Sequence, residues 1–253
     1  MSVFGETMLI FRRAMRLSLR NPVWVILGLI QPILYLALFG PLLKRVVRAP
    51  GFPPGDAWQV FVPGLLVQLG IFGAAFVGFG LIAEMRNGVV ERMRVSPASR
   101  VALLVGRVLR DVVVLVVQAI ILVVCAALFG LHAPLGGIVL GIVVVGLLGA
   151  AFSSASYAAA LLLKSEDALA PLLNGLFVPI LLLSGILLPM SLAPAWLRTV
   201  SDINPMKHVV DGVRALFLGD VGTATVFWGA FATVGLVVAG VALGTRTFQR
   251  ESS

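Results

Sequence analysis

The stretch EMRNGVVERMRVSP, residues 84–97, interrupts an otherwise apolar chain and decides how the rest of it is arranged. Eight charged residues lie between Glu84 and Arg110. At roughly 2.5 to 3.5 kcal/mol for each charge at the centre of a membrane helix, this region would cost on the order of 20 kcal/mol in hydrocarbon. We therefore expect it to lie outside the bilayer.

The composition of the whole chain is that of an integral membrane protein. Of its 253 residues, 60% are hydrophobic and only 12% are charged, and the mean hydropathy is +1.08. Soluble domains carry about 25% charged residues. Apolar stretches of the roughly 20 residues that a helical span needs fill most of the length. We expect one all-α membrane domain over residues 1–253, without a separate soluble domain.

Hydropathy predicts six spans, at residues 23–43, 58–83, 111–130, 136–163, 169–188 and 227–244. Residues 1–21 are predicted to form an amphipathic helix on the lipid surface, because apolar side chains recur there at spacings of three and four: Phe4, Met8, Phe11, Met15 and Leu19. A cytoplasmic extension of the first span is the alternative. Residues 190–223 combine prolines, charges and an amphipathic pattern, which indicates short re-entrant or interfacial helices.

The basic residues predict the orientation in the membrane. An even number of spans puts both termini on one side, and thirteen of the nineteen lysines and arginines fall on that side together with residues 84–97. The positive-inside bias therefore makes this side cytoplasmic and the membrane a bacterial inner membrane. Because the net charge of +8 gathers at the ends of apolar stretches, it argues against nucleic acid as a partner. The single cysteine, Cys125, excludes an intrachain disulfide.

Several function classes lack their chemistry in this sequence. The acidic residues Asp111, Glu166 and Asp167 fall at predicted span ends, so the midplane carboxylate of a proton-coupled carrier is missing. The histidines, His132 and His208, fall in predicted loops, which leaves no nucleophile and base pair for intramembrane hydrolysis and no metal site. No G-x-x-x-x-G-K-[ST] phosphate loop occurs. We expect a non-enzymatic subunit, and any ATPase that drives it must be a separate chain.

Residues 84–97 have the pattern of a short docking helix. Val89 and Met93 share one face, and charges at Glu91, Arg92 and Arg94 lie elsewhere on it. Asn87-Gly88 precedes this helix and Pro97 ends it. An apolar ridge flanked by charges suits a partner's groove. The alternative is a solvated loop that only obeys the positive-inside bias.

Two motifs resemble those of one known family. Glu84, Arg86, Gly88, Glu91, Arg92 and Ser96-Pro97 are similar to the cytoplasmic coupling segment of the type-2 ABC exporter permeases. The stretch from Asn204-Pro205 through VVDGVRALFLG, residues 209–219, resembles the segment between the fifth and sixth spans of that family. The resemblance covers nearly the whole chain and is closest in character to the drug-resistance branch.

The resemblance implies an exporter with two ATP-binding subunits and two permeases, the second being identical or a close paralogue. ATP and Mg would lie on the partner subunit, and this chain would bind no cofactor. Residues in contact with the ATPase or at its junction would be Glu84, Arg86, Gly88, Val89, Glu91, Arg92, Met93, Arg94 and Pro97. Helices near the outer surface would close the pathway through Asn204, Pro205, Lys207, Asp211 and Arg214, of which Lys207, Asp211 and Arg214 can pair at i+4 and i+3. Simple surface pairing of these charges is the alternative.

Uncharged polar residues in the spans are the candidates for lining a substrate pathway, namely Gln31, Gln68, Gln118, Ser153 and Asn174. They favour an amphipathic drug or a lipid over a bare ion. Such groups also join helices by hydrogen bonds worth about 0.6 to 2 kcal/mol. Two other functions stay open at this point, a membrane scaffold or assembly factor that does not transport, and an ion-coupled carrier.

The docking helix yields a direct test. Arg92→Glu reverses a charge that orients the helix, and Val90→Pro breaks it. Either change should uncouple ATP hydrolysis from export while the protein stays in the membrane, as measured by the two rates in vesicles. Normal export by both variants would show that the segment does not dock.

Overall fold

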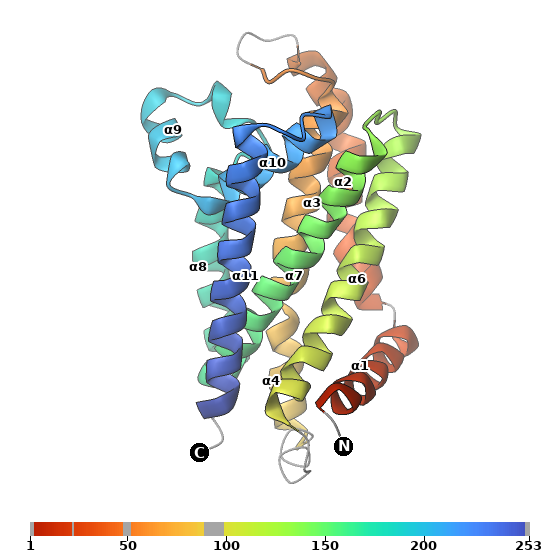
Figure 1. Cartoon of the computed structure of the whole chain (residues 1–253), viewed down its shortest axis with the longest axis vertical. Coiled ribbons are helices and arrows are strands. Elements are labelled where there is room, and N and C mark those ends of the chain that lie inside the picture. Colours follow the sequence, from red (N-terminus) through yellow and green to blue (C-terminus); the bar gives the residue numbers. More distant parts are fainter. Residues whose placement is uncertain (1–2, 22, 48–51, 89–98, 251–253) are drawn as a thin grey trace.

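The computed structural model describes residues 3–21, 23–47, 52–88 and 99–250. Of these residues 85% are helical, and the described ranges contain no strand. In chain order the helices are α1 (Val3–Arg20), α2 (Val23–Val46), α3 (Ala57–Ala75), α4 (Val77–Arg86), α6 (Arg100–Leu128), α7 (Leu135–Leu163), α8 (Glu166–Leu183), the 3-10 helix η1 (Met190–Leu192), α9 (Ala195–Asp202), α10 (Pro205–Leu218) and α11 (Ala224–Arg250) (Figure 1).

Six helical segments in these ranges are long and apolar enough to cross a membrane, which confirms the predicted all-α membrane fold. They cover α2, the pair α3–α4, α6, α7, α8 and α11. Two of them differ in detail from the predicted bounds. The second is divided at Phe76, and the third begins at Arg100 rather than near Asp111.

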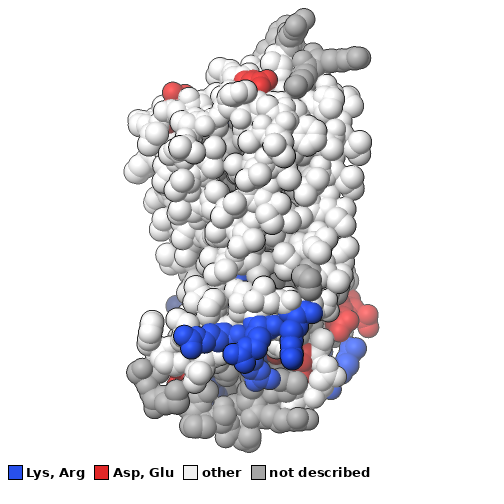
Figure 2. Space-filling view, turned by 90° about the vertical axis from the view of Figure 1, so that its right-hand side faces the viewer, with Lys and Arg blue, Asp and Glu red and all other residues white. Residues whose placement is uncertain are grey.

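Both termini lie at one end of the bundle, which we call the termini end, while α9 and α10 lie at the opposite end (Figure 1). The helix α1 lies across the termini end and packs on α6. Figure 2 shows lysine and arginine atoms gathered in one band near that end, below a tall surface of uncharged residues. Arg12, Arg13, Arg16 and Arg20 of α1 are exposed there. This separation is what a membrane-embedded bundle requires.

The central helix is α7, which contacts α3, α4, α6, α8, α10 and α11. Glycines let other backbones approach it closely. A Cβ on Gly137 would lie 2.0 Å from the carbonyl oxygen of Leu216, and one on Gly141 would lie 2.9 Å from the Phe217 ring. Gly137 and Gly141 therefore form the surface of α7 on which α10 packs closely.

Gly137→Ala tests this contact between α7 and α10. Its new methyl would meet backbone, and overpacking costs about 1 to 3 kcal/mol. Gly136→Ala is a matched control, since it has the same gain in helix propensity and no atom lies within 4 Å of its Cβ position. We expect Gly137→Ala alone to lower the melting temperature of the detergent-solubilised protein. Equal melting temperatures for the two variants would contradict this packing.

Candidate functional site

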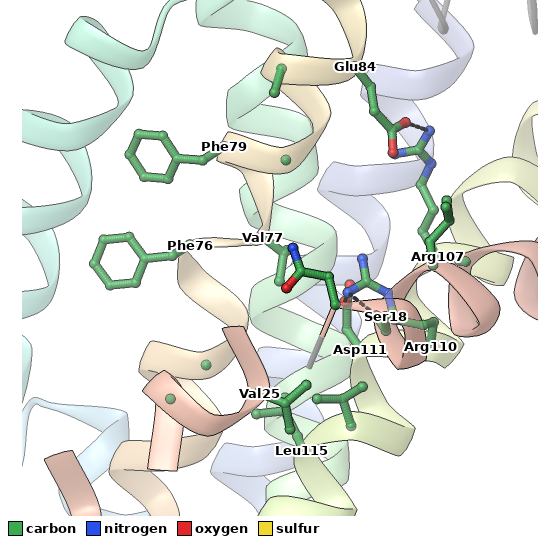
Figure 3. A pocket seen from close by; sticks show the side chains of 18 of the residues that line it. Ser18, Val25, Phe76, Val77, Phe79, Glu84, Arg107, Arg110, Asp111 and Leu115 are labelled. Carbon is green, nitrogen blue, oxygen red and sulfur yellow. Dashed lines mark hydrogen bonds and ion pairs between the residues drawn. The ribbon is translucent and has the colours of Figure 1, made fainter. Parts of the chain in front are cut away.

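A cavity of about 890 Å³ lies toward the termini end, between α1, α2, α3–α4 and α6 (Figure 3). One part of its wall is apolar and carries the rings of Phe72, Phe76 and Phe79 together with Leu115. Gln118 of α6 also lines it and donates a hydrogen bond of 2.7 Å to the carbonyl oxygen of Val25 in α2. This bond joins α6 to α2 in the wall of the cavity.

Charged side chains form the other part of the wall, and four of them are paired with one another. Arg107 donates to Glu84 at 2.5 Å, which joins α6 to α4. Arg110 lies 3.1 Å from one carboxylate oxygen of Asp111, and Tyr157 of α7 donates to the other at 2.6 Å. Figure 3 shows Arg107 and Glu84 as one pair and Arg110, Asp111 and Ser18 as a second group. The cavity therefore offers a large apolar surface with charge confined to one region.

Sequence reasoning missed this charged cluster. It placed Asp111 at the end of a span and assigned it no role, whereas only 3% of Asp111 is exposed in the structure. A signal was present, because Arg107, Arg110 and Asp111 are spaced i, i+3 and i+4 and so share one face of a helix. Among the described residues, no group of three or more His, Cys, Asp or Glu could hold a metal ion.

The described part of the predicted coupling segment consists of its beginning. Glu84 pairs with Arg107, and Arg86 lies 3.7 Å from Glu166 at the start of α8. Gly88 follows α4 with a positive φ of 67°. These contacts hold the end of α4 between α6 and α8. The other predicted contact residues, Val89, Glu91, Arg92, Met93, Arg94 and Pro97, lie outside the described residues, and the coupling role stays a prediction.

Chain segments on both sides of residues 89–98 are fixed to the bundle. After this stretch, the backbone N–H of Ser99 donates to Glu6 of α1 at 2.8 Å and so caps the start of α6. Gly106 lets α1 approach α6, since a Cβ there would lie 2.8 Å from the Ile10 side chain. The described chain thus stops after α4 and resumes where α1 and α6 meet.

The five predicted pathway residues do not share one site. Gln118 lines the cavity, but the other four do not. Gln31 is exposed on α2 and Asn174 is exposed on α8, where Asn174 donates to Ala170 of its own helix. Ser153 is buried and bonds within α7, and Gln68 is buried in α3. The pathway role of these residues remains a prediction.

At the opposite end, the predicted pairing within α10 is present. Asp211 lies 4.0 Å from Lys207 and 3.4 Å from Arg214. Lys207 also bonds to Asp202 of α9, and this hydrogen bond and the lysine charge lower the pKa of the Asp202 carboxyl. The ion pair between Lys207 and Asp202 therefore persists as pH falls, until the pH passes through the lowered pKa of Asp202.

Arg214 does more than pair on the surface, because 6% of it is exposed. Its guanidinium donates to the carbonyl oxygens of Val60 in α3, at 2.9 Å, and Gly185 after α8, at 2.6 Å. Burial lowers its pKa, and Asp211 opposes that shift. Asn204, which precedes Pro205 and caps α10, donates to the carbonyl oxygen of Ile180 at 2.8 Å. We call Asn204 and the helix α10 together the α10 cap. This cap is thus bonded to α3 and to the α8 region, while its role as a gate stays a prediction.

A family model for the ABC-2 type transporter matches residues 5–218 of the chain, which is most of its length. The chain belongs to the ABC-2 type transporter family. The match includes the α10 cap and every residue that lines the cavity. As an ABC-2 permease, the chain is a multi-pass membrane protein, and the family confirms the resemblance seen in the sequence.

Several relatives of this ABC-2 permease are themselves permeases. The chain is 26% identical over 243 residues to the daunorubicin resistance ABC transporter permease protein DrrB1 of Streptomyces coeruleorubidus, covering 95% of this chain and 85% of the relative. It is 27% identical over 200 residues to the putative transport permease ycf38 of Cyanophora paradoxa, covering 78% and 69%. It is 26% identical over 190 residues to the probable multidrug ABC transporter permease YbhR of Escherichia coli (strain K12), covering 70% and 48%.

The hydrogen bond from Tyr157 to Asp111 can be tested with the two tyrosines of the chain. Tyr157→Phe removes a buried donor to a carboxylate, at a cost of about 1 to 3 kcal/mol. Tyr35→Phe removes a hydroxyl that accepts only an exposed bond from Gln31, so its effect should stay within about 0.5 kcal/mol. We expect this difference in the unfolding free energy in mixed micelles. A Tyr157→Phe protein as stable as Tyr35→Phe would show that the bond contributes little.

Proposed function

We propose that this ABC-2 permease is the membrane subunit of an ATP-driven exporter for an amphipathic drug, antibiotic or lipid-like molecule. The cavity at the termini end carries this proposal. Its volume of about 890 Å³ is within the range of pockets for drug-sized ligands, about 300 to 1,000 Å³. Aromatic and aliphatic side chains would hold the apolar body of such a substrate, and the charged cluster would face its polar part.

The charged side chains of the cluster are already paired with one another, which favours an amphipathic substrate over a bare ion. Both oxygens of Asp111 are occupied, and Glu84 is occupied by Arg107. An ion-coupled carrier needs an acid that can take up and release its ion. A substrate with a polar end and a large apolar part instead gains from burial in proportion to the apolar area removed from water.

The energy would come from two separate ATP-binding subunits, docked at residues 84–97 of two permease copies. The support is the position of α4, which lines the cavity and leads directly into that segment. Force applied there by a partner would reach the cavity through one ten-residue helix. The sequence has no phosphate loop of its own.

The termini end would face the cytoplasm of a bacterial cell, in accordance with its basic residues. The exposed arginines of α1 would lie against the anionic headgroups of the inner leaflet, beside the cavity. Substrate would then enter from the cytoplasm or that leaflet, and the α10 cap would lie at the exit. Daunorubicin is a suitable probe, since one relative is a daunorubicin resistance permease.

The proposal is tested by purifying the tagged chain from its native membranes with its partner and reconstituting the complex in liposomes. We expect a chain with a phosphate loop to copurify in equal amount, and daunorubicin uptake into inside-out vesicles to need ATP. Absence of such a chain would favour a scaffold. Uptake that an uncoupler abolishes and that ATP depletion spares would indicate an ion-coupled carrier.

Filling the cavity should block transport. Gly80 lines the cavity and no atom lies within 4 Å of its Cβ position, so this position has room for a side chain to begin, and Gly80→Phe adds a ring to the cavity wall. Gly175→Phe is the matched control, because Gly175 also has open space but lies on α8 outside the cavity. We expect Gly80→Phe to lower daunorubicin uptake about tenfold or more, a loss of about 1.4 kcal/mol. Equal uptake by both variants would place the pathway elsewhere.

A further inference from the structure

The second span is interrupted at Phe76, and a side chain from another helix bridges the interruption. At this α3–α4 break the N–H of Phe79 turns back to the carbonyl oxygen of Phe76, at 3.2 Å, in place of that of Ala75. The Ser156 hydroxyl of α7 donates to the freed carbonyl of Ala75 at 2.5 Å and accepts from the N–H of Gly78 at 3.0 Å. One hydroxyl thus serves both sides of the break.

This bridge is specific to Ser156 among neighbouring serines of α7. Ser153 and Ser154 are also buried, but their hydroxyls bond to Ala150 of their own helix. The backbones of α4 and α7 touch beside Ser156, since a Cβ on Gly78 would lie 2.7 Å from the Ser156 carbonyl oxygen. Ser156 is therefore a contact point between the central helix α7 and the first turn of α4.

The two parts of the span have different surroundings. The α3 part is packed into the core, with buried residues along its whole length from Ala57 to Ala75. In α4 the buried residues are Gly78, Leu81 and Ile82. At its far end α4 is held by the ion pairs Glu84–Arg107 and Arg86–Glu166. Hence α4 is a short helix that packs on α7, has three buried residues, and is held at its far end by ion pairs.

We propose that Ser156 is the positioning residue of a hinge at the α3–α4 break, and that rotation of α4 about this hinge opens and closes the cavity. Phe76, Phe79 and Glu84 lie at or beyond the break, so any rotation of α4 moves both the apolar wall and the charged wall. Because hydrocarbon supplies no substitute partner, the Ser156 hydroxyl keeps the break intact while α4 moves. The inference rests on the proposed function, in that it names how the ATPase partner controls this cavity.

Ser156→Ala removes the bridge, and Ser154→Ala is the matched control in the same helix. In the reconstituted complex we expect Ser156→Ala to speed amide hydrogen exchange in residues 76–86 about tenfold, as the loss of a buried hydrogen bond implies, with α6 and α7 unchanged. The number of daunorubicin molecules transported per ATP hydrolysed should fall. Gly78→Ala, which pushes α4 away from Ser156, should act in the same direction.

Exchange and coupling that are the same in Ser156→Ala and Ser154→Ala would overturn the hinge. So would faster exchange spread over all spans, since that indicates general destabilisation. The two proposals fail separately. If the wild-type complex shows no ATP-dependent uptake, the proposed function fails, and localised exchange in residues 76–86 still decides whether Ser156 holds a hinge.

Discussion

Hydrocarbon offers no hydrogen-bonding partner to an exposed backbone group, and this constraint governs how the irregular parts of the chain are held. At two irregular places, the α3–α4 break and the end of α8, side chains from other parts of the chain supply the missing partners. Ser156 serves the α3–α4 break, Asn204 serves the carbonyl of Ile180 near the end of α8, and Arg214 serves the carbonyl of Gly185 beyond it. The interruptions thus specify their neighbours, because α7 and α10 must lie where these bonds can form.

The same constraint applies to charge. Arg107, Arg110 and Asp111 lie on a helix that is mostly apolar, yet each has an oppositely charged partner. Removing one member of a buried pair costs about 3 to 5 kcal/mol, since the other is left uncompensated. The charged wall of the cavity therefore contains two groups, one that joins α6 to α4 and one that joins α6 to α7. Substituting one of these charged residues alone would destabilise the protein strongly. Removing the Tyr157 hydroxyl perturbs the cluster less, because it leaves every charge in place.

Hydropathy could predict the six spans and the amphipathic α1, because length and apolar periodicity are local properties of the sequence. It could not predict the cavity, because hydropathy says nothing about which helices are neighbours. The start of α6 shows the limit. Counting back about 20 residues from Gly130 places the start of the span near Asp111, but it cannot show that Glu6 of α1 accepts the Ser99 N–H where the helix begins. Polar residues have a related limit: Ser153 and Asn174 satisfy their hydrogen bonds within their own helices, so polarity alone does not indicate which way they face.

The helix α3 connects the two ends of the molecule. Arg214 is bound to it at Val60, near the end that carries the α10 cap, and Ser156 is bound at Ala75, beside the cavity. Between these bonds most of α3 is buried, and close-packed interiors resist deformation. Movement is consequently easier outside α3, in α4, of which only Gly78, Leu81 and Ile82 are buried. Rotation of α4 would then change the cavity while α3 and the buried face of α10 keep the opposite end in place, and this difference between the two ends is the physical requirement for opening them at different times.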